Sequence, residues 1–197
     1  MDSQTTLVNS SSPSIDLVFE KTSLVALRNT VYLNSRPLYT ITTSDRDGAK
    51  TKIFDASTST LLVTIERRAF FSDRIIFTNR YDGKSLKVNN WIKELNVSGQ
   101  HPMHVIETPF GNFIWKVHVL HRHALFSEFD AEIPIAYMRP PTRSSPMGLH
   151  LERGTENFRE EILGSFLILE QRMKMKEKVS AVGDGIAMQA SMPFGGT

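Results

Sequence analysis

The sequence predicts a mainly β protein, a roughly 12-stranded antiparallel barrel or closed sandwich around a C-terminal hydrophobic helix. Short apolar stretches separated by turn residues recur from Ile15 to Leu151, as in antiparallel β domains. The run from Ile162 to Leu169 then has no polar face except at Ser165, so a helix there must be surrounded by protein or lipid. This run is far shorter than the ~20 residues that span a bilayer. We therefore expect it to fill the centre of the β domain.

The expected strands follow from the spacing of the turn residues. We place them at residues 16–20, 25–33, 37–44, 49–55, 60–67, 74–80, 84–94, 103–108, 113–120, 123–129, 133–138 and 147–152. So many consecutive strands do not fit one flat sheet and imply two packed sheets or closure into a barrel. Alternation along the strand at 113–120 puts Phe113, Trp115, Val117 and Val119 on the inward face.

Turn residues mark the connections between these strands. Asp47-Gly48 and Asp82-Gly83 indicate tight hairpins, because Asp-Gly readily adopts the positive φ angles that such turns need. The segments 55–58, 109–112 and 140–143 combine Pro, Gly, Asp, Asn, Ser and Thr, and indicate further turns or loops.

The closing helix is predicted over residues 155–178. Its apolar positions recur at three- and four-residue steps, at Phe158, Ile162, Phe166, Leu169 and Met173. Thr155 is placed as the N-cap, with acidic residues in the early turns and cations in the later ones, which suits the helix dipole. We expect residues 1–14 to form a flexible leader, 15–178 one β-barrel domain, and the non-periodic residues 179–197 a flexible tail.

Composition excludes several classes of function. The net charge of +2 on 197 residues is too small to indicate a nucleic-acid partner. The chain has no cysteine, which excludes disulfides, thiolate metal sites and cysteine nucleophiles. The amino terminus shows neither an export signal nor a lipid-attachment signal. We expect a cytoplasmic protein with no transmembrane segment, whose contact with membranes is peripheral.

Three features together resemble a known superfamily. They are the turn Phe54-Asp55-Ala56-Ser57-Thr58, the strand Gly111-Asn112-Phe113-Ile114-Trp115-Lys116 and the closing apolar helix. Residues 15 to 178 resemble the tubby C-terminal-like superfamily, and within it an uncharacterised fungal family related to LURP-one-related proteins and phospholipid scramblases. The resemblance implies a β-barrel wrapped around a hydrophobic helix. Tubby-type domains bind phosphoinositides through basic side chains on the barrel exterior, but no such site matches here residue by residue.

One predicted hairpin carries six cations and an adjacent aromatic pair. Such a patch can contact anionic lipid headgroups, with each near-surface cation contributing about 1 kcal/mol. The alternative is a solvated charge pattern that protects a strand edge from aggregation. The candidate lipid-contact residues are Arg67, Arg68, Phe70, Phe71, Arg74, Arg80, Lys84 and Lys87.

We expect a non-enzymatic binding or adaptor module that needs no cofactor or metal and whose partner is anionic lipid or an unidentified protein. A first alternative is a barrel that carries a small apolar ligand, although the closing helix would fill its interior. A second is a metal enzyme in which His118, His121 and His123 converge with Glu128 or Asp130. The sequence has no Gly-x-Ser-x-Gly nucleophile elbow.

Overall fold

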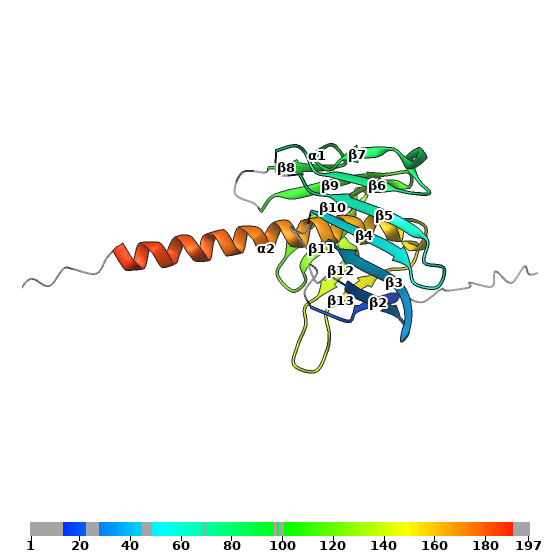
Figure 1. The fold of residues 1–197 in the computed structure, drawn as a ribbon, viewed down its shortest axis with the longest axis horizontal. Helices are drawn as coiled ribbons and strands as arrows, with labels where there is room; N and C mark the ends of the chain where they lie inside the picture. Colours follow the sequence, from blue (N-terminus) through cyan, green and yellow to red (C-terminus); the bar gives the residue numbers. More distant parts are fainter. Residues whose placement is uncertain are drawn as a thin grey trace, which may run out of the picture.

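A computed structural model describes residues 14–22, 28–44, 49–68, 70–96, 98 and 101–190, with residues 178–190 described by their backbone alone. These residues form a single antiparallel sheet of 13 strands that curls around one long helix (Figure 1). The predicted fold class, mainly β with a C-terminal helix, is confirmed. Of the predicted leader at 1–14, only Ser14 lies within the described residues.

The strands run consecutively along the chain. They are β1 (Ile15–Phe19), β2 (Arg28–Leu33), β3 (Arg36–Thr43), β4 (Lys50–Asp55), β5 (Leu61–Glu66), β6 (Arg74–Phe77), β7 (Ser85–Lys87), β8 (Ile92–Leu95), β9 (Met103–Thr108), β10 (Gly111–His118), β11 (Arg122–Ser127), β12 (Asp130–Arg139) and β13 (Gly148–Leu151). Strand β1 also pairs with β13, so β7 and β8 are the two edges of the sheet. The barrel is therefore not closed by hydrogen bonds, and the short helix α1 (Val88–Trp91) connects the two edges.

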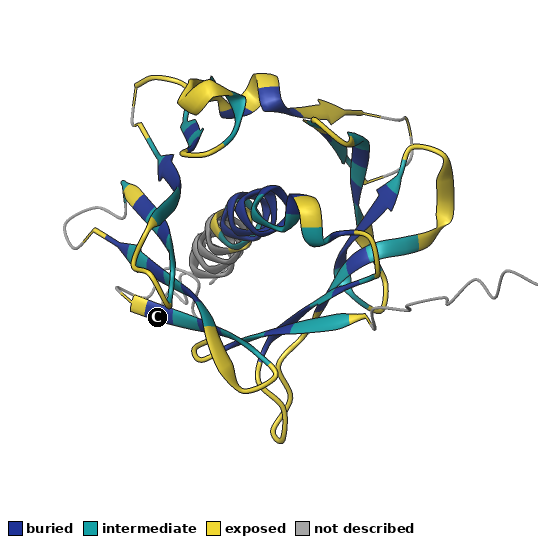
Figure 2. Cartoon of the chain, turned by 90° about the vertical axis from the view of Figure 1, so that its right-hand side faces the viewer, coloured by how far each residue is buried: buried dark blue, intermediate teal, exposed yellow. Residues whose placement is uncertain are grey.

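The long helix occupies the centre of the curled sheet. A 3-10 turn, η2 (Glu156–Phe158), leads into α2 (Arg159–Ala190). Every residue from Glu161 to Gln171 is buried, and Figure 2 shows the sheet surrounding this part of the helix. An apolar helix without a polar face must be enclosed in this way, and each large side chain that it buries contributes about 1.5–3 kcal/mol.

One buried hydroxyl on this helix, that of Ser165, has both a donor and an acceptor as partners. The hydroxyl of Ser165 accepts a hydrogen bond from Trp115 Nε1 at 2.9 Å and donates to the carbonyl of Glu161 at 2.7 Å. The ring of Phe166 lies next to Phe19 and Trp115, with centroid distances of 5.9 and 6.3 Å. Ser165 therefore fixes the rotation of α2 against β10, because a buried hydroxyl without a partner would be costly.

The prediction of one continuous strand over residues 84–94 is wrong in its middle. The structure breaks it into β7, α1 and β8, which raises the number of strands from the predicted 12 to 13 in the described residues. Val88 and Trp91 are both buried, and a three-residue spacing brings two side chains to one face of a helical turn but to opposite faces of a strand. Burial of this pair therefore favours the helical turn.

The predicted inward face of β10 is confirmed for Phe113 and Trp115 but not for the two valines. Val117 is partly exposed and Val119 is fully exposed. Strand β10 ends at His118, so Val119 belongs to the following turn and the alternation no longer applies to it. Val117 pairs with the buried His123 of β11 but lies at the end of the barrel, where the interior opens.

Both ends of the closing helix differ from the prediction. Thr155 precedes the helix, but its hydroxyl donates back to the carbonyl of Glu152 at 2.7 Å instead of capping the first turn. At the other end α2 continues to Ala190, beyond the predicted end at residue 178 and into the predicted tail. Extending an existing helix costs far less than starting one, and the segment 186–190 is rich in good helix formers.

Turn predictions have mixed outcomes. Asp82 and Gly83 have the expected positive φ angles of 55° and 65°, but they belong to a 3-10 turn, η1 (Tyr81–Gly83), inside a longer connection between β6 and β7. Asp55 organises the β4–β5 turn by accepting hydrogen bonds from the backbone N–H groups of Ser57 and Thr58. Asp47-Gly48 lies outside the described residues.

In an antiparallel sheet, successive loops lie alternately at the two ends of the barrel. The β5–β6 and β10–β11 connections reach the part of α2 that leaves the barrel, through Asp73 with Arg172 at 3.8 Å and Arg122 with Glu170 at 2.9 Å. We call this the exit end; among the described residues it comprises 67, 68, 70–73, 119–122 and 170–177. The opposite end, with residues 78–84, 109–110, 128–132 and 152–160, is the start end.

Candidate functional site

The eight candidate residues do not share one surface. Arg67 is directed inward, where its guanidinium donates to Thr51 Oγ1 at 3.2 Å and to the side chain of Gln171 on α2. Burial lowers the pKa of Arg67, and the nearby Asp73 opposes this shift. Arg67 therefore links β5 to the helix at the exit end.

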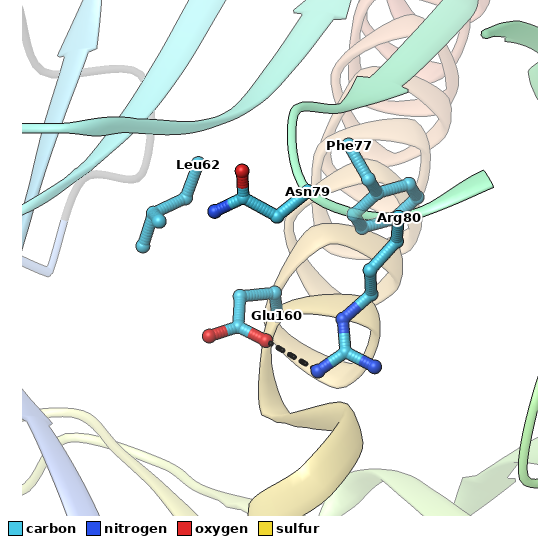
Figure 3. Close-up of a pocket in the computed structure, with 5 residues that line it drawn as sticks. All are labelled: Leu62, Phe77, Asn79, Arg80 and Glu160. Atoms are coloured by element: carbon cyan, nitrogen blue, oxygen red, sulfur yellow. Dashed lines mark hydrogen bonds and ion pairs between the residues drawn. The ribbon is translucent and has the colours of Figure 1, made fainter. Parts of the chain in front are cut away.

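Arg80 lies at the start end and also holds the helix. Its guanidinium lies 3.3 Å from Glu160 and 3.4 Å from Glu161, and it donates to the carbonyl of Asn157. Figure 3 shows Arg80 and Glu160 facing each other beside a cavity of about 110 Å³, which is also lined by Leu62, Phe77 and Asn79. The ion pair anchors the first turns of α2 to the β6–β7 connection.

The remaining four cations lie nearer the surface. Arg68 pairs with Glu66 at 3.2 Å, and Lys84 pairs with Asp82 at 2.9 Å at the start end. Arg74 and Lys87 are directly opposite each other on β6 and β7. The structure thus brings Arg68, Arg74 and Lys87 to the exit half of this hairpin and places Lys84 away from them.

The aromatic pair is exposed, as predicted. Phe70 and Phe71 are 94% and 76% exposed in the β5–β6 loop of the exit end. A second apolar pair stands at the same end in the β10–β11 turn, where Val119 is 100% and Leu120 is 72% exposed. Single exposed apolar side chains are common, whereas adjacent pairs such as these form a candidate interaction surface.

Cations of α2 contribute to the exit end. Lys174 lies 3.5 Å from Glu170, and Arg172 donates to Asn89 Oδ1 at 2.9 Å. The sequence interpretation of these cations, with Lys176, as partners of the helix dipole is wrong, because α2 continues to Ala190 and they are not in its last turn.

The three clustered histidines do not converge. The rings of His118 and His121 stack at 5.0 Å, while His123 points into the core and lies 3.2 Å from the carboxylate of Glu170. Burial tends to raise the pKa of Glu170, but the neighbouring His123 and Arg122, which lie 3.2 and 2.9 Å from its carboxylate, outweigh it, so the pKa is lowered. No group of three or more metal-ligating side chains forms among the residues that the structure describes.

Neither carboxylate proposed for a metal enzyme reaches the histidines. Glu128 accepts a hydrogen bond from Asn112 at 3.0 Å. Asp130 instead accepts backbone N–H bonds from Glu132 and Ile133 at 2.9 and 3.1 Å. The arrangement that the metal-enzyme alternative requires is therefore not formed by these residues.

Comparison with known proteins identifies the family. The chain matches a family of unknown function, DUF6593, over residues 26–175. It belongs to this family. No curated protein matches the DUF6593 chain. A solved X-ray structure of a protein from Arabidopsis thaliana is similar to it at 11% sequence identity, with a TM-score of 0.46, covering 81% of the DUF6593 chain and 91% of the plant protein.

Sequence reasoning missed the Val119-Leu120 pair of this DUF6593 protein because it extended the strand through residue 120. The signal was the polar His121-Arg122-His123 segment that follows the pair. Because the strand ends at His118, the turn begins two residues earlier than predicted and leaves both apolar side chains outside the core. In the described part of the chain, no helix has the length and apolar character needed to cross a membrane.

Proposed function

We propose that this DUF6593 protein is a non-enzymatic binding module that contacts anionic phospholipid membranes, including those with phosphoinositides, through its exit end. The observation that carries the proposal is the pair of exposed apolar loops, Phe70-Phe71 and Val119-Leu120, on either side of the emerging α2. Apolar side chains at loop tips can enter the boundary between headgroups and acyl chains, where they are removed from water.

Electrostatics at the exit end supports an anionic surface. Arg68, Lys174 and Lys176 lie near the two loops, and each cation close to a charged membrane contributes about 1 kcal/mol. The acidic Glu66 and Glu177 reduce this attraction, so we expect moderate binding that needs the apolar loops as well. The anionic cytoplasmic leaflet is the membrane surface that fits this chemistry.

The enclosed helix also supports a wider relationship. A helix surrounded by an antiparallel sheet is the architecture implied by the resemblance to the tubby C-terminal-like superfamily and its fungal branch. We infer membership in that superfamily from this arrangement. The lipid contact proposed here uses loop tips and α2, not a basic site carried over from a tubby-type domain.

Co-sedimentation with vesicles tests the proposal. Wild-type protein should sediment with phosphatidylserine or phosphoinositide vesicles, more weakly at physiological than at low salt, and not with neutral vesicles. The double variant Phe70→Ser/Phe71→Ser should lose most of this binding. Phe129→Ser/Ile133→Ser is the matched control, because it removes an exposed apolar pair from the start end.

Equal loss of binding in both double variants would contradict the assignment to the exit end. Absence of binding to every anionic vesicle would refute lipid contact and leave an adaptor that binds another protein. Circular dichroism of each variant establishes that the fold is retained.

A further inference from the structure

A second cavity opens at the exit end between α2 and the strands β8 to β11. Its volume is about 250 Å³, and its apolar wall includes Trp115, Val117, Leu169 and Met173. For comparison, an apolar cavity of ~150 Å³ holds a benzene molecule. The helix therefore fills the centre of the barrel but leaves room for a small ligand where it emerges.

Two histidines that line this cavity each have a buried ring nitrogen without a hydrogen bond to the described part of the chain, His104 Nδ1 and His123 Nε2, and only the latter has a carboxylate within ion-pair distance, that of Glu170 at 3.2 Å. His104 Nδ1 is inaccessible to solvent and forms no hydrogen bond with any residue that the structure describes. Such atoms are rare in folded proteins, because a buried donor or acceptor without a partner is costly. Burial lowers the pKa of His104; the charges of Arg172 and Lys176 lower it further, whereas Glu94 opposes them. The imidazole is thus favoured in its neutral form, able to donate or accept one hydrogen bond.

The charged groups around the cavity favour an anion. Arg172 and Lys176 line the cavity together with one carboxylate, that of Glu94, and Arg172 also lies 3.8 Å from Asp73. Arg172 is held near the opening by Asn89 at 2.9 Å. The ammonium of Lys116 instead lies over the ring of Phe126, on the outer face of the sheet, and points toward the carbonyl of Ala131 at 3.5 Å. Lys176 is exposed on α2 one turn beyond Arg172.

We propose that this cavity binds an anionic amphiphile with a single short acyl chain, its chain against Trp115 and Leu169 and its head beside Lys176 and Arg172 at the opening. Apolar walls with a few convergent polar groups are typical of small-molecule sites. This inference goes beyond the proposed membrane contact and does not depend on it. The same chemistry is offered by a free fatty acid and by the acyl chain of a membrane phospholipid.

Fluorescence quenching by a brominated probe tests the site. The chain has two tryptophans, and Trp91 lies outside the cavity wall, in edge-to-face contact with Phe77. In the Trp91→Phe variant, Trp115 is therefore the sole tryptophan. A medium-chain fatty acid brominated at its terminal carbon, used below its micelle concentration, should quench Trp115 saturably. The matching brominated alcohol should bind about tenfold more weakly, because it lacks the charge.

Two further variants, made in the Trp91→Phe background, locate the site. Val117→Phe places a larger side chain in the cavity wall and should abolish saturable quenching. Lys176→Met should weaken acid binding by about fivefold, which corresponds to ~1 kcal/mol. Lys174→Met is the matched control on the same helix; Lys174 pairs with Glu170 and does not line the cavity, so its replacement should leave the affinity nearly unchanged.

The outcomes distinguish three cases: a membrane lipid as the ligand, a free amphiphile as the ligand, and no specific binding in the cavity. Quenching by vesicles of chain-brominated phosphatidylserine would assign the site to membrane lipid, and quenching by the soluble acid alone would assign it to a free amphiphile. Non-saturable quenching, equal affinity for acid and alcohol, or an unchanged response in Val117→Phe would overturn the proposal. Loss of vesicle binding with the soluble acid still bound would refute only the membrane contact.

Discussion

Replacing Glu161 by glutamine should stabilise the protein at alkaline pH. Glu161 is fully buried in the first turns of α2, and neither carboxylate oxygen has a hydrogen-bond partner among the described residues. Arg80 Nε lies 3.4 Å away and provides partial compensation. Burial raises the pKa of Glu161 from 4.5 to about 7, while Arg80 acts to lower it.

The magnitude follows from this shift in pKa. Each pKa unit corresponds to ~1.4 kcal/mol, so ionising Glu161 in the folded state rather than the unfolded state costs about 3 kcal/mol. Because the folded pKa is raised, the stability is fully present below the unfolded pKa and is lost as the pH rises through about 7. Glutamine keeps the shape without the charge and should avoid this loss.

Urea denaturation at about pH 4.5 and about pH 8.5 measures the effect. Glu161→Gln should exceed the wild type by about 3 kcal/mol at the higher pH and match it within ~1 kcal/mol at the lower pH. Glu160→Gln is the matched control, because Glu160 is partly exposed and also pairs with Arg80. A variant that is less stable than wild type at both pH values would refute the argument and indicate that the ion pair with Arg80 dominates.

Other substitutions test the core and one turn. Phe166→Ala should cost about 3–5 kcal/mol in a urea titration, whereas the exposed Phe129→Ala should cost less than ~0.5 kcal/mol; similar costs would contradict the enclosed helix. Phe166→Asp should yield no soluble folded protein, judged by the soluble fraction and circular dichroism. Gly164→Leu should cost about 1–3 kcal/mol, because a Cβ there already lies 3.2 Å from Ile75 Cδ1, and unchanged stability would exclude this close packing. Asp55→Ala should cost ~1 kcal/mol at neutral pH, a modest value because the turn is exposed. Hydrogen bonds donated by Ser57 and Thr58 lower the pKa of the Asp55 carboxyl to about 2, so the difference from wild type should vanish as the pH falls through this value.

Much of the fold could be predicted because local patterns of apolar and polar residues determine it. The run of α2 that is apolar on all sides must be enclosed by other parts of the protein. Alternation along β10 assigns Phe113 and Trp115 to its inward face, where both are buried. The exceptions arise where tertiary packing overrides the local pattern. Val88 and Trp91 form a helical turn because both reach the core. Helix α2 continues past residue 178, through Gly183 and Gly185, in a segment that contains no proline.

The candidate site was harder to predict because its contacts join distant parts of the chain. From the sequence, Arg67 and Arg80 are expected to be surface cations. Their partners, Gln171 and Glu160, lie on α2, far away in the sequence. Only the three-dimensional placement shows that both arginines hold the helix. Exposure of Phe70-Phe71 could be predicted because a loop between two strands has few places to bury adjacent aromatic side chains.

A fluorophore at each end of the barrel tests the central claim most directly. The chain has no cysteine, so Ser72→Cys at the exit end and Glu132→Cys at the start end each allow labelling at one site. Upon addition of phosphatidylserine vesicles, an environment-sensitive label at residue 72 should shift to shorter wavelength and one at residue 132 should not. A shift at residue 132 alone, or at neither position, would contradict membrane contact through the exit end.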